Sequence, residues 1–133
     1  MVEARAEWID GERFACQASS GHAIVVDSDR TRNTAAGPME LVLIGLCACT
    51  STDVVSILTK KREPFTSLTV RAEAERAPKP PSVYTDIKLI YTVGGGVSKK
   101  AMEDAVRLSK EKYCSVSQML AKSAKISFEI EYF

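Results

Sequence analysis

The chain has 133 residues, of which 45% are hydrophobic and 26% charged, and its formal net charge is +1 at pH 7. This length suits one domain over 1–133, and the near-neutral charge offers no basic stripe for nucleic acid. The longest apolar run, 41–49, is less than half of the roughly 20 residues needed to span a bilayer. The charged segment 1–8 is too polar for a signal peptide. We therefore expect a soluble cytoplasmic protein with neither membrane nor nucleic-acid partners.

The first 37 residues predict three strands and a loop. Imperfect alternation predicts a strand over 4–8, and the turn signal Asp10-Gly11 predicts a hairpin with a return strand over 13–17. A second turn, Ser19-Ser20-Gly21, precedes an apolar run that predicts a third strand over 22–27. The polar segment 28–37 has no periodicity, so we expect it to be a loop.

A long helix is predicted from Pro38 to about Arg62. Proline suits the first turn of a helix, Glu40 complements the positive end of the helix dipole, and Pro64 ends the helical pattern. The first half of this helix is apolar on nearly every face. We therefore expect a central helix that is buried all round.

The remaining half of the chain predicts strands and helices that alternate. Strands are expected over 65–76 and 83–93, a helix capped by Ser98 runs to about 113, and a short helix follows through 122. The clearest strand signal is 124–133, where Ile126, Phe128, Ile130 and Tyr132 alternate with polar residues. The predicted order is β-β-β-α-β-β-α-β, which is typical of an α+β domain.

Four cysteines in a cytoplasmic chain are expected to be reduced. Cysteine often fills a core as a small hydrophobic residue, which is the favoured interpretation for Cys16 and Cys47. For Cys49 and Cys114 the pattern alone leaves packing and reactivity equally open. The chain has one histidine, and Cys47 and Cys49 point roughly 200° apart on a helix. We therefore predict no metal site and no cofactor.

Two motifs resemble the OsmC family of osmotically inducible and organic hydroperoxide resistance proteins. Residues 38–49, PMELVLIGLCAC, resemble the family's P-x-E-L-L-x-A-A-L-x-x-C signature, and the register after Pro38 selects Cys49 over Cys47. The following DVVSIL is similar to the D-V-V-x-I-L helix of a less characterised OsmC-like subgroup. Residues 114–117, CSVS, resemble the element that carries the family's second cysteine.

The resemblance implies an OsmC-like fold and a thiol mechanism. Family members are intertwined homodimers whose strands wrap two central helices, with sites at the subunit interface. It implies that Cys49 attacks an organic hydroperoxide and that Cys114 resolves the resulting sulfenic acid to a disulfide. A dithiol reductant, such as a lipoylated protein, would then restore the two thiols.

The resemblance also implies an arginine that activates the first cysteine and an acidic residue that orients the arginine. Arg30 and Arg32 are the available arginines before Pro38, and their spacing does not separate them. The family's acid directly follows the proline, where this chain has Met39. Glu40 comes one position later, a rotation of about 100° on a helix, which favours Glu40 as a partner of the helix N-terminus over an arginine clamp.

Three functional hypotheses follow for this sequence. The leading hypothesis is a thiol-dependent organic hydroperoxidase that serves oxidative stress defence. One alternative is a dimeric stress-associated protein that binds a small apolar ligand. The other is a redox sensor that transmits thiol oxidation to a partner.

Overall fold

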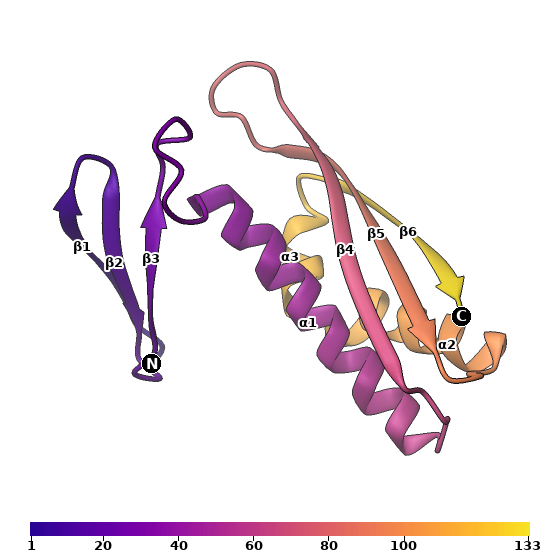
Figure 1. Cartoon of the computed structure of the whole chain (residues 1–133). Helices are drawn as coiled ribbons and strands as arrows, with labels where there is room; N and C mark the ends of the chain where they lie inside the picture. Colours follow the sequence, from indigo (N-terminus) through magenta and orange to yellow (C-terminus); the bar gives the residue numbers. More distant parts are fainter. The chain divides into compact units, whose positions relative to one another are not determined.

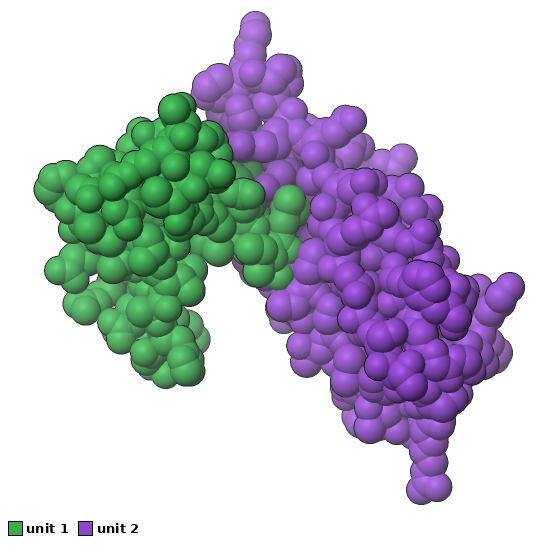
Figure 2. All heavy atoms as spheres, in the orientation of Figure 1, with its two compact units in different colours: residues 1–44 green, residues 45–133 purple.

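The computed structural model describes all of residues 1–133, which divide into two compact units (Figures 1 and 2). Unit 1 is Met1–Ile44 and unit 2 is Gly45–Phe133. The boundary falls inside the long helix α1, Pro38–Lys60. Each unit contains its own three-stranded sheet. The single domain expected from the chain's length stays a prediction.

Unit 1 is an antiparallel meander in the order β1-β2-β3. Its strands are Ala4–Asp10, Arg13–Ala18 and Ala23–Asp27. Gly11 has the positive φ of +46° that the predicted hairpin turn requires. The sheet has little core of its own, because every residue of β1 before Asp10 is exposed, including Trp8.

Unit 2 contains a mixed sheet in the order β4-β5-β6 (Figure 1). Its strands are Ser67–Arg76, Tyr84–Gly94 and Lys125–Tyr132. Strand β5 pairs antiparallel with β4 and parallel with β6. The parallel pair requires a crossover, which the helices between β5 and β6 supply. Because β5 is the middle strand, both Leu89 and Ile90 on its opposite faces are buried.

The crossover contains three consecutive helical pieces. These are α2, Lys99–Leu108, the π-helical turn η1, Ser109–Tyr113, and α3, Ser115–Leu120. The predicted cap is present, since the Ser98 hydroxyl accepts the Ala101 N–H at 3.1 Å. The sequence predicted this region as helical but gave no sign of the π-helical turn, because one widened turn leaves the apolar spacing almost unchanged.

The burial of α1 differs from the all-round burial that the sequence predicted. Within the single chain only one stripe of the helix is buried, and its members are four residues apart: Leu46, Thr50, Val54 and Leu58. Ile44 and Val55, on other faces, are exposed. A single chain therefore covers only one side of this apolar helix.

The length and composition of α1 also bear on the membrane question. An 18-residue window of the helix has a mean hydropathy of 2.0, which is enough for a membrane span by length and composition. The nine-residue run counted in the sequence understates this apolar stretch. The observation is weak evidence for a membrane, since the core helix of a soluble protein passes the same test.

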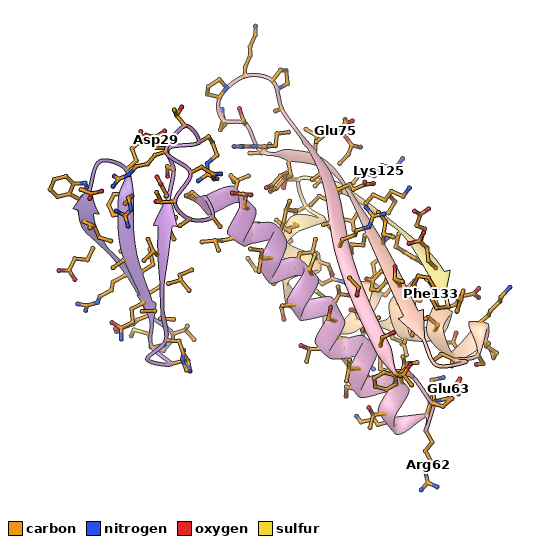
Figure 3. All side chains as sticks on the ribbon, viewed as in Figure 1. Asp29, Arg62, Glu63, Glu75, Lys125 and Phe133 are labelled. Atoms are coloured by element: carbon orange, nitrogen blue, oxygen red, sulfur yellow. The ribbon has the colours of Figure 1, made fainter.

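The end of α1 is built from backbone hydrogen bonds. Arg62 has a positive φ of +56°, its N–H donates to the Thr59 carbonyl, and the Glu63 N–H donates to the Leu58 carbonyl. These two bonds form a Schellman motif, which satisfies carbonyl groups that the helix leaves unpaired. The Arg62 side chain extends away from this end of the helix (Figure 3). Pro64, which the sequence identified as the stop, follows directly.

Candidate functional site

Cys49 and Cys114, the two cysteines selected from the sequence, are brought together within unit 2. Cys49 lies on α1 and is half-buried, whereas Cys114 is fully buried and forms the N-cap of α3. Both cysteines are free, and the Cys49 side chain lies close enough to Cys114 to influence its pKa. The structure therefore brings two free thiols from distant parts of the chain close together.

The surroundings of Cys114 favour its protonated form. Burial raises the pKa of the Cys114 thiol, and the hydrogen bond with Cys49 and the charge of Cys49 raise this pKa further. The Ser117 N–H donates to Cys114 Sγ at 3.4 Å and acts in the opposite direction. A thiol whose pKa is raised above its usual value stays protonated at neutral pH.

The other two cysteines have no such arrangement. Cys47 and Cys16 are both half-buried and free. Burial raises the pKa of the Cys47 thiol, which favours an unreactive thiol at neutral pH. No group of three or more His, Cys, Asp or Glu side chains in the chain is arranged to hold a metal ion.

Arg30 and Glu40 form an ion pair within unit 1. Arg30 Nη1 lies 2.8 Å from Glu40 Oε1, and the same Glu40 oxygen accepts the Gly37 N–H at 2.9 Å. Glu40 thus serves as the helix N-terminal partner that the sequence predicted and also clamps an arginine. Glu40 is rotated by about 100° around the helix from the position of the family's acid. This rotation does not prevent the clamp, because Arg30 lies on a loop, outside the helix, and reaches Glu40 from there.

The contacts within unit 1 distinguish Arg30 from Arg32, two arginines that their spacing in the sequence did not distinguish. The Arg30 guanidinium also donates to the carbonyl oxygens of Asp27 and Ala35. Arg32 instead pairs with Asp10 Oδ1 at 2.7 Å, at the end of β1, and the hydrogen bond to Asp10 raises the pKa of Arg32. Arg30 is therefore the arginine that Glu40 orients.

Asp27 organises the loop that carries both arginines, and sequence inspection missed it. This buried carboxylate accepts the Asp29 N–H at 2.9 Å, the Thr34 N–H at 3.0 Å and the Thr34 hydroxyl at 2.6 Å. Asp29, which is labelled in Figure 3, in turn accepts the N–H groups of Thr31 and Arg32. An aspartate directly after the apolar run 22–26 was the available signal, since Asp commonly caps loop amides.

The pH dependence of this loop follows from Asp27. The hydrogen bond from the Thr34 hydroxyl is the largest cause that lowers the pKa of Asp27, from 3.8 to about 2. A carboxyl whose pKa is lowered on folding stabilises the fold above its unfolded pKa, and this stabilisation is lost as the pH falls through the folded pKa. We expect the wild type to melt higher than Asp27→Asn at neutral pH and the difference to vanish between pH 3.8 and about 2. Thermal unfolding followed by circular dichroism at stepped pH measures this, and a difference that persists at the lowest pH contradicts it.

An open groove of about 360 Å³ lies between α1 and the end of the crossover helices in unit 2. Its lining combines the apolar side chains Ile57, Leu108 and Tyr113 with polar and charged residues, including Asp53 and Lys60. The groove therefore has a mixed character. Tyr113 directly precedes Cys114 in the chain.

Comparisons with known proteins identify relatives of this chain. A family model described as OsmC-like protein matches residues 31–129. The chain is similar to protein YhfA of Escherichia coli K12, with 38% identity over 131 residues that cover 98% of this chain and 97% of the relative.

Solved structures give the same result for the fold. A hypothetical protein from Aquifex aeolicus VF5 matches 100% of this chain over 98% of its own, with a TM-score of 0.86 and 34% identity. An organic hydroperoxide resistance protein from Elizabethkingia anophelis has a TM-score of 0.74 and 14% identity, covering 100% of this chain and 96% of that one. At that identity the likeness concerns the fold.

Proposed function

Because this chain belongs to the OsmC-like protein family, we propose that it reduces organic hydroperoxides to alcohols through Cys49 and Cys114. The observation that carries the proposal is the placement of the buried Cys114, the N-cap of α3, close enough to Cys49 on α1 for Cys49 to influence its pKa. Some structural neighbours are named organic hydroperoxide resistance proteins, which supports this substrate class. Oxidative stress defence in the cytoplasm is the corresponding biological role.

The proposed reaction has three balanced steps. The Cys49 thiolate attacks the terminal oxygen of the hydroperoxide, the O–O bond breaks, and the alkoxide takes a proton and leaves as alcohol. Cys49 is now a sulfenic acid. The Cys114 sulfur attacks it, an S–S bond forms, and the thiol proton leaves with the hydroxyl as water. A dithiol, such as that of a lipoylated protein, then reduces the disulfide and is itself oxidised.

We assign supporting roles to Arg30 and Glu40. The first step requires a thiolate, whereas a free cysteine titrates near 8.5. A guanidinium keeps its proton under all relevant conditions, so Arg30 is the proposed cation that favours the Cys49 thiolate. Its ion pair with Glu40 at 2.8 Å supports an oriented guanidinium. Arg32, which is paired with Asp10, is assigned to the structure of the loop.

A homodimer is the proposed assembly. Apolar side chains remain exposed on α1 and on the sheet of unit 1, where Trp8 is 65% exposed and Ile24 is 52% exposed. Exposed apolar surface of this kind marks an interaction site. A second copy of the chain that covers both surfaces would provide the burial that the sequence predicted for the central helix.

Mass spectrometry after titration with cumene hydroperoxide tests the proposed function. We expect the wild type to lose two hydrogens and to yield a peptide pair linked through Cys49 and Cys114. We expect Cys114→Ser to accumulate a sulfenic acid at Cys49, because the resolving thiol is absent, and dimedone to trap it. Oxidation that is spread equally over Cys16, Cys47 and Cys49, without the linked pair, contradicts the proposal and favours the ligand-binding or sensor alternatives.

A further inference from the structure

Four polar side chains form a row of hydrogen bonds through the largely apolar interior of unit 2. Thr50 Oγ1 lies 2.7 Å from the Tyr91 hydroxyl and 2.8 Å from Ser109 Oγ, which in turn donates to Asp53 Oδ2 at 2.8 Å. Thr50, Tyr91 and Ser109 are each at most 1% exposed, and Asp53 lies at the half-buried end. These side chains come from α1, β5 and η1, so the row links three elements.

The Asp53 carboxylate fixes the direction of every hydrogen bond in this row of side chains. Ser109 gives its only hydroxyl proton to Asp53, so it accepts from Thr50. Thr50 has then used its own proton and must accept from Tyr91. Burial raises the pKa of Tyr91 to about 12, so the phenol keeps its proton and remains the terminal donor. All the hydroxyl groups are satisfied in one arrangement, which makes the link specific and rigid.

Thr50 and Ser109, which share the central hydrogen bond of the row, are each linked directly to one of the two cysteines. Thr50 directly follows Cys49 on α1. Ser109 accepts the Cys114 N–H through its backbone carbonyl at 2.8 Å, which is the hydrogen bond that closes the π-helical turn. Single π-turns of this kind frequently occur at functional sites. Ser109 therefore holds α1 through its side chain and Cys114 through its main chain.

We propose that the Tyr91–Thr50–Ser109–Asp53 row positions the Cys114 thiol against Cys49 and so favours the disulfide between them. These four are assigned as positioning residues, which act through the elements that carry the two cysteines. The inference deepens the proposed function and rests on it for the natural oxidant. In that setting, fast closure of the disulfide protects the Cys49 sulfenic acid from further oxidation to sulfinic acid.

The equilibrium constant for the Cys49–Cys114 disulfide tests the proposal without any peroxide. The protein is equilibrated with mixtures of reduced and oxidised dithiothreitol, and the disulfide fraction is measured by mass spectrometry after acid quenching. Thr50→Val removes the central hydroxyl and preserves side-chain volume. We expect it to lower the equilibrium constant about fivefold or more, as for the loss of a buried hydrogen bond, and Thr50→Ser to restore most of it.

Two further variants make the result specific. Thr52→Val is the matched control, because Thr52 lies on the same helix, is exposed, and bonds only to the Ala48 carbonyl at 2.9 Å. It should leave the constant unchanged. Tyr91→Phe keeps the ring in the core and removes only the terminal donor, and it should also lower the constant. This variant carries the test if Thr50→Val does not fold.

The outcomes separate this inference from the proposed function. Constants that are equal in the wild type, Thr50→Val and Tyr91→Phe overturn the positioning role. If the two variants have lowered constants but the wild type does not react with cumene hydroperoxide, the positioning role is supported and the peroxidase function is overturned.

Discussion

Replacing Cys49 with serine should lower the consumption of cumene hydroperoxide by on the order of 10³-fold or more, because a hydroxyl group is far less nucleophilic than a thiolate. The measurement is steady-state peroxide loss with dihydrolipoamide as reductant. Cys47→Ser is the matched control, since Cys47 is half-buried, lies two positions earlier on the same helix, and should leave turnover nearly unchanged. Equal losses in the two variants would contradict the assignment of Cys49 as the attacking residue.

The same assay tests the assignment of Arg30. Arg30→Met should lower turnover by about 10- to 100-fold near pH 7, and the deficit should shrink above about pH 8.5, where a free thiol ionises without help. Arg32→Met is the comparison, because Arg32 is paired with Asp10 at the other side of the loop. If the deficit of Arg30→Met is the same at every pH, Arg30 does not act through the ionisation of the thiol.

The second large effect concerns assembly. Val55→Asp should convert a species of twice the chain mass into one of the single-chain mass, measured by light scattering after size exclusion. Val55 is 39% exposed on α1, and a charge at this position would be buried without a partner in a dimer that covers the helix.

Val83→Asp controls for the introduced charge. Val83 is 43% exposed and lies just before β5, so the substitution alters a similar side chain away from the central helix. We expect this variant to retain the mass of the wild type. A wild type that has the single-chain mass at every concentration would contradict the homodimer.

The order of strands and helices could be predicted from the sequence because it depends on local patterns. Alternation over 124–133 and the apolar run that begins at Pro38 each report on neighbouring residues, and the observed elements follow β-β-β-α-β-β-α-β with α3 as the predicted short helix. The family was also recognisable from Pro38 to Cys49, since the proline register is a local feature.

The burial of α1 could not be predicted from the same pattern. An apolar face indicates that something covers the helix, but it does not say whether the cover belongs to the same chain. Within one chain only the stripe through Leu46 and Leu58 is covered. The remaining faces are the basis for the proposed dimer.

By itself, the sequence determined the elements and the family, and it favoured Cys49 over Cys47. Only the tertiary structure decided that Arg30 and not Arg32 pairs with Glu40, and that Thr50 and Ser109 meet although they are 59 positions apart. A threonine and an aspartate on an apolar helix were a visible signal for buried polar contacts, but their partners were not. The physical reason is that side-chain hydrogen bonds between distant elements depend on how those elements pack, and a one-dimensional pattern contains only the spacing within each element.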